Sequence, residues 1–516
     1  MKISSTITGV SYLAFTVTAT TNITGNTIVT IPTSQPPFAK SVSPNLVGFS
    51  LEFQFWPTYA GNATGKPNQY VNQLLGNLKE RTGKPPAVRV GGTSENTAYV
   101  DTSLELWNAS QLAEVYGPFT HRSNTSIGRD WYVIAGNLPA GTEFTFGLNL
   151  YDESEVVAQT KMIAEAFQGS RASLTKNVTL KFIQIGNEPN FYFPSADGYV
   201  SHWAALAKAA LKHIKLGGKG DPSLWIGSEV IGSSTSWSLV GTLPAGILDN
   251  SSIDKAGQIL EEHLYSGALG LGAIPGGPPP GTLMEKSSIR ANISGLYDGL
   301  LTTESYDKTY YLGETGSYAN EGIFGLSNTG ESAVWTVDYL LKLASMGVSR
   351  VYLHSTPNRM FACFQPGWGF TNGTGIERPH IMPMYNGILV VDEMIGTHGD
   401  AEVAEIQNNN AAIASYAVWE SGKLARVALI NSNVYTETDA ARSAVNVTLS
   451  GGFSGKDATV KRLSIPTTTA TEGITWAGQS FETDNGKPSG DVVETPLHGS
   501  SVIVSASEVV MISFSG

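Results

Sequence analysis

Eight short apolar segments, alternating with helical patterns, constrain the fold of this chain most strongly. They are rich in Val, Ile, Leu, Phe and Tyr and lack strict polar alternation, which is typical of strands buried on both faces. The segments are 46–53, 87–91, 144–150, 180–188, 224–229, 259–265, 309–314 and 350–354.

Helical periodicity lies between several of these segments. The windows are 70–81, 153–167, 198–216, 283–300 and 331–346. Eight strand–helix units over roughly 350 residues predict an α/β protein with a closed (β/α)8 barrel, because a doubly wound open sheet rarely needs so many units.

The pattern of polar and apolar residues changes after about residue 396. Helical periodicity disappears, and short strands with polar alternation predict an all-β sandwich. These strands are expected at 401–407, 411–418, 424–429, 443–449, 459–464, 480–483 and 501–514. The stretch 7–31 has the same pattern, so we expect it to pair with the C-terminal strands. The predicted domains are therefore 1–40 (strands joining the sandwich), 41–395 (the barrel) and 396–516 (the β-sandwich).

Composition and charge exclude several classes of protein. With 41% hydrophobic and 15% charged residues, the chain of 516 residues is neither disordered nor a coiled coil. A net charge of −12 without a basic stripe predicts no nucleic-acid partner. No apolar run is long enough for a membrane span. No cluster has metal-ligand spacing, so neither a metal nor a cofactor is expected. Whether the chain is a monomer or a homodimer stays open.

The N-terminal sequence bears on localisation. Lys2 precedes a mildly apolar stretch that ends at Val17-Thr18-Ala19, an acceptable cleavage site. The stretch also has the alternation of a strand, and several Asn-x-Ser/Thr sequons add mild support for a secretory route. We expect a secreted protein. The single cysteine, Cys363, allows no intrachain disulfide and is expected to be a small buried hydrophobe.

Polar residues end the eight predicted strands, where the active site of a (β/α)8 barrel lies. They are Glu52, Arg89, Asn149, Asn187, Glu188, Glu229, His263, Tyr265, Glu314 and His354. A carboxylate at the end of a buried strand costs desolvation energy unless it is paired or functional. Glu188 and Glu314 are therefore the first candidates for catalysis.

Two carboxyls that converge from facing sides of a barrel are what glycoside hydrolysis requires. Glu188 ends the fourth strand and Glu314 the seventh, which lie across the barrel from each other. In a retaining mechanism the two groups lie ~5–5.5 Å apart, and one has a raised pKa so that it carries a proton. Glu314 has to stay ionised, and Arg89 is a plausible neighbour to keep it so.

Three sequence blocks carry a resemblance to a known family. They are Val88-Arg89-Val90-Gly91-Gly92-Thr93-Ser94, Gly186-Asn187-Glu188-Pro189-Asn190-Phe191 and Leu312-Gly313-Glu314-Thr315-Gly316-Ser317. In this order, and with a trailing β domain, they resemble glycoside hydrolase family 79 of clan A, which holds fungal and bacterial β-glucuronidases and the heparanases. The second block alone is less specific, because arabinofuranosidases and other clan A families share it.

The resemblance implies roles for the central residues. Glu188 would be the acid/base and Glu314 the nucleophile. Asn187 would hydrogen-bond the sugar 2-hydroxyl, a contact that strengthens in the transition state. Tyr265 would orient Glu314 and contribute to the substrate site, and Arg89 would support the nucleophile.

Further residues follow from the same resemblance. Glu52 and Gly92 would line the terminal sugar subsite, and Tyr318 is a candidate for contact with the substrate carboxylate. The bacterial glucuronidases add a Gly-Tyr pair after the eighth strand, and this sequence lacks it there. Arg359 could serve instead through a charge-assisted pairing with the uronate.

These features predict a secreted, cofactor-independent, retaining exo-β-glucuronidase acting on terminal glucuronic acid, with or without a 4-O-methyl group. The alternatives are a heparanase-like endo-enzyme, a neutral-sugar clan A glycosidase such as an arabinofuranosidase or xylosidase, and a non-catalytic carbohydrate-binding barrel. The negative charge argues against a sulfated polyanion as substrate. Trp56, Trp368 and Tyr385 are candidate stacking platforms, although such aromatics more often pack in a core.

Overall fold

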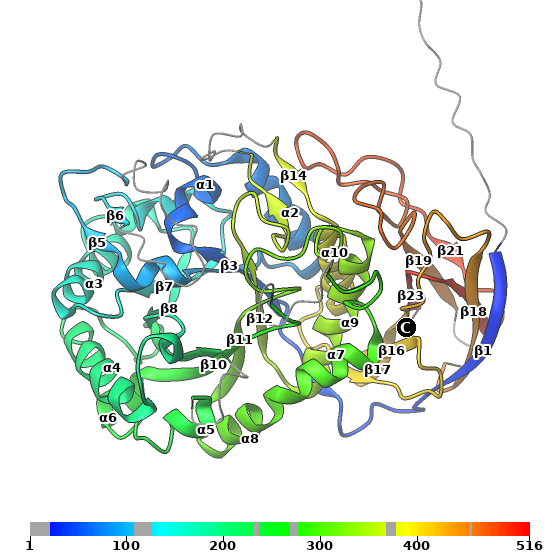
Figure 1. The fold of residues 1–516 in the computed structure, drawn as a ribbon, viewed down its shortest axis with the longest axis horizontal. Helices are drawn as coiled ribbons and strands as arrows, with labels where there is room; N and C mark the ends of the chain where they lie inside the picture. The colour runs from blue at the N-terminus through cyan, green and yellow to red at the C-terminus, as the bar shows by residue number, and fades with distance from the viewer. Residues whose placement is uncertain are drawn as a thin grey trace, which may run out of the picture.

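Eight parallel strands close into a barrel in the computed structural model (Figure 1). The structure describes residues 21–107, 125–230, 237–268, 277–367, 378–453 and 457–515. The barrel strands are β3 (Val47–Glu52), β4 (Ala87–Gly91), β7 (Glu143–Leu148), β8 (Thr179–Ile185), β9 (Ser223–Val230), β10 (Gly257–Tyr265), β11 (Thr309–Gly316) and β12 (Arg350–Ser355). All eight predicted strands overlap one of these.

Aromatic side chains fill the half of the barrel interior that lies toward the N-terminal ends of the strands. Phe182, Trp225, Tyr311 and Tyr352 form a separate buried cluster with Ala87 and Ile259. The Trp225 and Tyr352 ring centroids lie 5.0 Å apart, and Phe182 and Tyr311 meet edge to face at 5.9 Å. Because this layer closes the barrel below the strand ends, polar residues at the C-terminal ends lie above an apolar floor.

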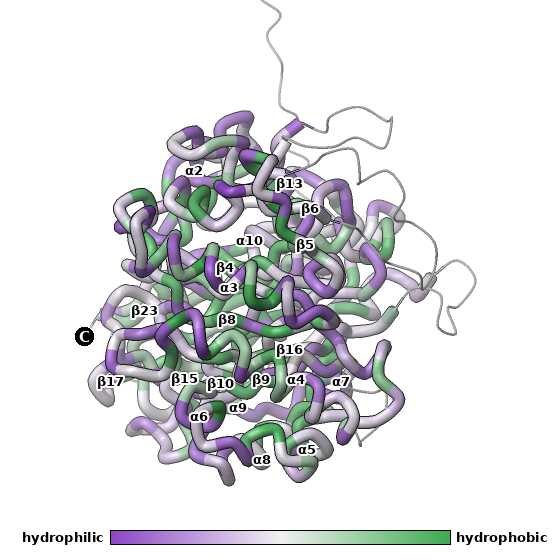
Figure 2. The backbone as a smooth tube through the Cα atoms, turned by 90° about the vertical axis from the view of Figure 1, so that its left-hand side faces the viewer, coloured by the Kyte–Doolittle hydropathy of each residue, from purple (hydrophilic) through white to green (hydrophobic). Residues whose placement is uncertain are grey.

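Helices cover the outside of the barrel. They are α1 (Trp56–Ala60), α2 (Gln69–Thr82), α3 (Glu153–Phe167), α4 (Ala196–Ala210), α5 (Leu239–Thr242), α6 (Ser251–Ala256), α7 (Lys286–Ile293), α8 (Tyr297–Ser305), α9 (Gly330–Met346) and α10 (Pro383–Ile395). Local signals set their ends: Asn68 caps the first turn of α2, and Gly83 ends that helix in the left-handed region. Hydrophobic stretches lie toward the middle of the molecule around β4, β8 and β10, and hydrophilic turns lie at its edges (Figure 2).

A β domain packs beside α9 and α10 and contains both ends of the described chain. Its strands are β1 (Thr21–Ile31), β2 (Lys40–Ser41), β15 (Glu402–Glu405), β16 (Ile413–Glu420), β17 (Lys423–Asn431), β18 (Arg442–Gly451), β19 (Ala458–Ser464), β20 (Thr475–Trp476), β21 (Thr495–Pro496), β22 (Ser501–Ser505) and β23 (Glu508–Phe514). One sheet has the order β1-β18-β22, and the other runs from β2 through β15 to β20. Both inner faces contribute to one hydrophobic cluster, as in a sandwich.

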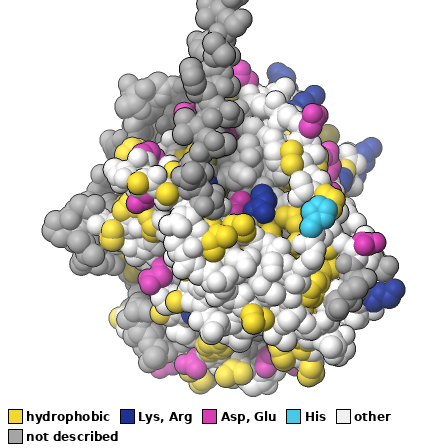
Figure 3. Space-filling view, turned by 90° about the vertical axis from the view of Figure 1, so that its right-hand side faces the viewer, with side chains coloured by type: hydrophobic (Ala, Val, Ile, Leu, Met, Phe, Trp, Pro, Cys, Tyr) yellow, Lys and Arg dark blue, Asp and Glu magenta, His cyan; other side chains and the backbone are white. Residues whose placement is uncertain are grey.

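The N-terminal segment joins this domain in two places. Strand β1 pairs with β18 in parallel, and β2 pairs with β15. In Figure 1 the blue β1 lies beside β18 at the right-hand edge. The face that carries these strands is mostly uncharged, with scattered charged side chains (Figure 3). The predicted fold class, a (β/α)8 barrel with a sandwich built from both chain ends, is thereby confirmed.

Ion pairs tie the barrel helices to the β domain. Arg290 of α7 pairs with Asp338 of α9, and its Nη2 donates to Glu405 Oε1 of β15 at 2.7 Å. Lys342 Nζ of α9 lies 2.9 Å from Glu405 Oε2. The Tyr416 hydroxyl of β16 donates to Asp338 as well. Because Asp338 and Glu405 are largely shielded from solvent, these contacts stabilise one packing of the two domains.

Some elements differ from the predictions. Residues 480–483 form no strand but only an isolated bridge between Ser480 and Ser489, so this prediction is wrong. The segment 501–514 is two strands, β22 and β23, because Ser507 turns the chain with a positive φ of 52°. Helix α10 was not predicted, since it is apolar nearly all round and lacks a polar face. Residues 1–20, which include the whole apolar stretch near the N-terminus and its expected cleavage site, lie outside the described part.

Four shorter strands form two small pairs near the catalytic face: β5 (Tyr99–Val100) with β6 (Ser126–Ile127), and β13 (Phe364–Gln365) with β14 (His380–Ile381). Among the described residues, no helix has the length and apolar character needed to cross a membrane.

Candidate active site

Glu188 and Glu314 converge above the barrel floor. Glu188 follows β8, and Glu314 lies near the end of β11. One carboxylate oxygen of each lies within 4.8 Å of the other and of a ring nitrogen of His263. This separation matches the close carboxyl pair of a retaining glycosidase rather than the wider pair of an inverting one.

The backbone at Glu188 adopts an uncommon conformation. Its φ of 50° and ψ of 55° lie in the left-handed region, and the 3-10 turn η6 (Pro189–Phe191) begins directly after it. A non-glycine residue there costs on the order of 1–3 kcal/mol, which the surrounding structure has to offset. Such strain at a strand end is common where a side chain is held for function.

The Arg89 guanidinium connects both carboxyl-bearing strands. Arg89 is fully buried, and its Nη1 donates to Glu314 Oε2 at 2.6 Å and to Ser50 Oγ at 2.8 Å. Its Nε donates to Gln184 Oε1 at 2.7 Å, and Nη2 donates to Asn187 Oδ1 at 2.6 Å. Because the amide oxygen of Asn187 accepts this bond, its amide nitrogen is oriented as a donor.

The backbone of Asn187 is held as well. Its N–H donates to Asn96 Oδ1 at 2.7 Å, and Asn96 Nδ2 donates back to the Asn187 carbonyl at 2.9 Å. Asn96 lies in the 3-10 turn η2 (Thr93–Thr97) after β4. The residue next to Glu188 is therefore fixed from both its side chain and its main chain.

Glu314 is surrounded by groups that favour its charged form. The Tyr265 hydroxyl donates to Oε1 at 2.7 Å, and His354 Nδ1 lies 3.4 Å from Oε2. Burial alone would raise the pKa of Glu314, but His354, His263 and Arg89 together outweigh it and hold that pKa well below its ordinary value. Glu314 is thus ionised at neutral pH.

The groups around Glu188 favour the neutral form of its carboxyl. Desolvation raises the pKa of its carboxyl, and the Glu314 charge raises it further, to about 8. Arg89 and His354 lower it only in part. At neutral pH Glu188 therefore carries a proton beside an ionised partner, which is the division of roles that an acid and a nucleophile need.

His263 lies between Glu188 and a second carboxyl. Its Nδ1 lies 3.1 Å from Glu188 Oε1, and its Nε2 lies 3.5 Å from Glu261 Oε2. Burial lowers the pKa of His263 even though Glu261 opposes the effect. His263 thus contacts the Glu188 carboxyl from one side and the Glu261 carboxyl from the other. Glu261 was missed at the sequence level, although consecutive charges in the strand sequence Glu261-Glu262-His263 were a signal.

Glu52 and Gly92 meet on the opposite side of the site. Glu52 Oε1 accepts the Ser94 N–H at 2.9 Å and also the Ser94 hydroxyl. Gly92 has a φ of 109°, and a Cβ there would lie 2.5 Å from Glu52 Oε2. His354 Nε2 lies 3.5 Å from Glu52 Oε2 and joins this pair to Glu314. Only glycine fits at position 92 without displacing the carboxyl.

Tyr318 and Arg359 lie farther along the loops. Tyr318 is buried, with its ring against Gly267, and its pKa is raised to about 12 by burial and then by Glu331. Arg359 Nη2 lies 3.2 Å from Glu321 Oε1. These contacts are with residues outside the carboxyl pair, so the roles of Tyr318 and Arg359 toward the uronate stay predictions.

The other aromatic candidates differ in what the structure says of them. Trp56 and Tyr385 are fully buried, and the Trp56 indole donates to the Trp131 carbonyl at 3.0 Å. They pack in the core and offer no face to a sugar. Trp368 lies outside the described residues.

The donors of Glu188, His263 and Glu314 lie close enough to suggest a cation site. A divalent ion there would compete with Arg89 for Glu314 and would require Glu188 to lose its proton. The electrostatics of the three groups therefore fit proton transfer better than metal binding.

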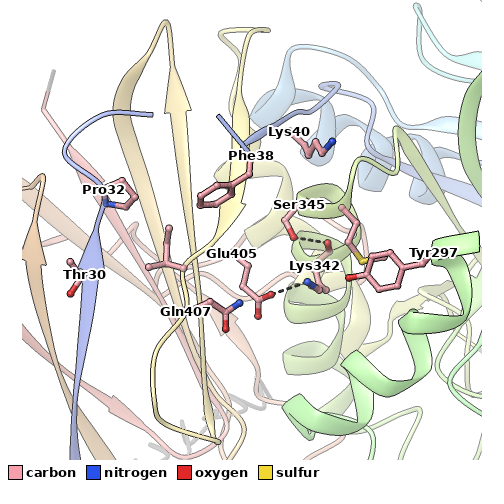
Figure 4. Close-up of a pocket in the computed structure, with 11 residues that line it drawn as sticks. Thr30, Pro32, Phe38, Lys40, Tyr297, Lys342, Ser345, Glu405 and Gln407 are labelled. Carbon is pink, nitrogen blue, oxygen red and sulfur yellow. Dashed lines mark hydrogen bonds and ion pairs between the residues drawn. The ribbon is translucent and has the colours of Figure 1, made fainter. Parts of the chain in front are cut away.

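A cavity of about 560 Å³ lies at the junction of the two domains (Figure 4). Lys342 and Met346 from the second half of α9 line it, with Glu405 from β15 and the exposed rings of Phe38 and Tyr297. Barrel helices run antiparallel to the strands, so this end of α9 lies away from the catalytic face. The cavity is separate from the carboxyl pair.

Comparisons with known proteins agree with this architecture. Residues 415–511 match the model of the glycosyl hydrolase family 79 C-terminal beta domain. A beta-glucuronidase of Aspergillus niger is 29% identical over 491 residues, covering 86% of this chain and 84% of that protein. A beta-glucuronidase of Neurospora crassa is 26% identical over 493 residues, covering 86% of each.

A solved structure shares the fold. The crystal structure of a 4-O-alpha-L-rhamnosyl-beta-D-glucuronidase from Fusarium oxysporum superposes with a TM-score of 0.77 at 22% identity. The match covers 94% of this chain and 100% of that one. The barrel and the trailing β domain, together with these matches, define a glycoside hydrolase. The match over residues 415–511 and the two fungal relatives support the resemblance of this chain to glycoside hydrolase family 79.

Proposed function

We propose that this enzyme is a retaining exo-β-glucuronidase that releases terminal β-linked glucuronic acid. The observation that carries the mechanism is the pair of carboxyls within 4.8 Å whose pKa values are displaced in opposite directions. The matched fungal relatives, both beta-glucuronidases, support the substrate.

The first step forms a covalent intermediate. The ionised Glu314 attacks the anomeric carbon, and protonated Glu188 gives its proton to the glycosidic oxygen as the bond to the leaving group breaks. Arg89 and Tyr265, which hydrogen-bond Glu314, hold its carboxylate in line for attack. Asn187 donates from its amide nitrogen to the sugar 2-hydroxyl, where the contact strengthens in the transition state.

The second step returns the enzyme to its starting state. Glu188, now ionised, takes a proton from water, and the hydroxide so generated attacks the anomeric carbon while Glu314 leaves. Two inversions give net retention of configuration. His263 contacts Glu188 throughout and keeps the carboxyl aimed at the oxygen that gains or loses the proton.

The proposal also covers the residues that bind the terminal sugar and the place where the enzyme acts. We place Glu52 and Gly92 in the subsite for the terminal sugar and propose that the enzyme is secreted, which the apolar stretch near the N-terminus supports. A heparanase-like activity is disfavoured, because a net charge of −12 does not suit a sulfated polyanion.

A panel of 4-nitrophenyl glycosides tests the function. We expect the β-glucuronide to be hydrolysed with a higher kcat/KM than the β-glucoside, β-galactoside, β-xyloside and α-arabinofuranoside. Nuclear magnetic resonance of the first-formed sugar should show the β-anomer. A preference for a neutral sugar would remove the uronate specificity, and an α-anomer as first product would remove the retaining mechanism.

Uronate selectivity provides a separate prediction. Arg359→Ala is expected to lower kcat/KM for the glucuronide by about 10- to 100-fold, because a hydrogen bond to a charged group is worth ~1.5–3 kcal/mol. The low activity on the β-glucoside should stay unchanged. Arg378→Ala, which removes an exposed arginine paired with Asp484, is the matched control. Equal selectivity in the Arg359 variant and the wild type would refute the role of Arg359.

A further inference from the structure

Three aromatic side chains are exposed near the proposed acid/base. Tyr151, Phe191 and Tyr192 expose 43%, 59% and 39% of their surfaces. Aromatic rings bury large apolar areas when they pack, so several exposed rings at one place suggest a surface that binds a ligand.

Two of the rings belong to the turn that Glu188 begins. The Phe191 N–H donates to the Glu188 carbonyl at 3.1 Å, and the Tyr192 N–H donates to the Pro189 carbonyl at 2.9 Å. The same hydrogen-bonded turn therefore positions the carboxyl and both rings. The backbone that carries both rings is therefore fixed relative to the backbone of Glu188.

The third ring comes from the end of a neighbouring strand. The Tyr151 N–H donates to Asn149 Oδ1 at 2.8 Å, which anchors the residue after β7. Its ring meets the Tyr192 ring edge to face at 6.0 Å and stacks on Phe193 at 6.5 Å. The loops after β7 and β8 thus build a joined aromatic surface.

A hydrogen bond joins the Tyr192 hydroxyl to the Asn96 side chain. Asn96 also holds the backbone of Asn187, the residue before Glu188. The hydroxyl end of the Tyr192 ring is therefore anchored beside the acid/base, while 39% of the residue's surface stays exposed.

The proposed reaction determines which part of the substrate this aromatic surface would contact. Glu188 protonates the oxygen of the departing group, so that group has to lie on the Glu188 side of the sugar. Glu314, Arg89 and Tyr265 occupy the nucleophile side. We infer that Tyr151, Phe191 and Tyr192 form a leaving-group platform, which takes a leaving group with a flat apolar face, either an aryl ring or a second pyranose. This inference rests on the proposed function.

Three donors with one sugar and different leaving groups test the platform. They are 4-nitrophenyl β-glucuronide, a disaccharide with glucuronic acid β-linked to a second pyranose, and β-glucuronyl fluoride, which has no ring to stack. Tyr192→Leu and Tyr151→Ala should each lower kcat/KM about three- to tenfold for a ring-bearing donor, the scale of one aromatic contact. Hydrolysis of the fluoride should stay within about twofold of the wild type. Loss on the aryl donor alone, or on the disaccharide alone, identifies which leaving group the platform takes.

Two further variants separate stacking from folding. Tyr192→Phe retains the ring, so the ratio of kcat/KM between the ring-bearing donors and the fluoride should stay as in the wild type. Tyr306→Ala removes a tyrosine that is also 39% exposed but follows α8, away from the catalytic face, and should change nothing. Equal losses on all donors, or no loss on any, would overturn the platform. If the wild-type protein hydrolyses none of the three, the proposed function itself fails, and the platform with it.

Discussion

Replacing Glu314 with alanine is expected to lower kcat for the β-glucuronide on the order of 10⁴–10⁶-fold, because the covalent intermediate can no longer form. Steady-state kinetics with 4-nitrophenyl β-glucuronide measure the loss. Added azide should restore part of the rate and give the α-glucuronyl azide, because the small anion attacks the anomeric carbon from the face that the carboxylate has left. Residual activity within about tenfold of the wild type would contradict the assignment of Glu314.

Glu262→Gln is the matched control for this variant. Glu262 is a buried glutamate of the same barrel wall, but its carboxylate accepts bonds from the Leu239 N–H at 3.0 Å and the Tyr310 hydroxyl at 2.8 Å, on the helix side. Its replacement should leave kcat unchanged. A comparable loss in both variants would indicate general damage to the barrel rather than loss of a nucleophile.

Replacing Glu188 with glutamine is expected to have the second large effect. It should lower kcat/KM about 10²–10⁴-fold for substrates whose leaving group needs a proton. The wild-type enzyme should lose activity as the pH rises through about 8, because Glu188 then loses the proton that it has to donate. Toward acid pH activity should persist below the usual range of a glutamate, because the lowered pKa keeps Glu314 ionised. The pH dependence of kcat/KM should therefore lack its alkaline limb in the variant.

The leaving group distinguishes the role of Glu188 from a structural one. 2,4-Dinitrophenolate departs without a proton from an acid. In the Glu188→Gln variant the rate of the first step should therefore fall far less with 2,4-dinitrophenyl β-glucuronide than with the 4-nitrophenyl or an alkyl glucuronide. Single-turnover measurements isolate that step. An equal loss for good and poor leaving groups, or an unchanged alkaline limb, would exclude Glu188 as the proton donor.

Local patterns predicted the barrel because its strands are continuous apolar runs and its helices are periodic. Because the active site of such a barrel lies at the C-terminal ends of its strands, the carboxylates at those ends indicate Glu188 and Glu314. Helix α10 escaped because a helix covered on all sides has no periodic polar face. The strand expected at 480–483 was wrong because alternation alone does not supply a neighbouring strand to pair with.

The partners of the catalytic groups could not be predicted in the same way. Ser50 and Gln184, which receive hydrogen bonds from Arg89, come from β3 and β8, and no local signal marks a serine or a glutamine as a partner of a buried cation. The contact of His263 with Glu188 joins β10 to the turn after β8, 75 residues away in the sequence. Such contacts follow from the closed barrel, which brings distant segments together.

The parallel pairing of β1 with β18 has a consequence for how the chain reaches its final form. The first described strand is synthesised early, but its hydrogen-bonding neighbour follows roughly 400 residues later, about 20–80 s at the usual rate of translation. During that interval the barrel can already close, while the early strand waits with an open edge. A fragment that begins after the barrel would lack this strand and leave one side of β18 bare. The carboxy-terminal domain is thus completed by a strand that leaves the ribosome long before the domain itself.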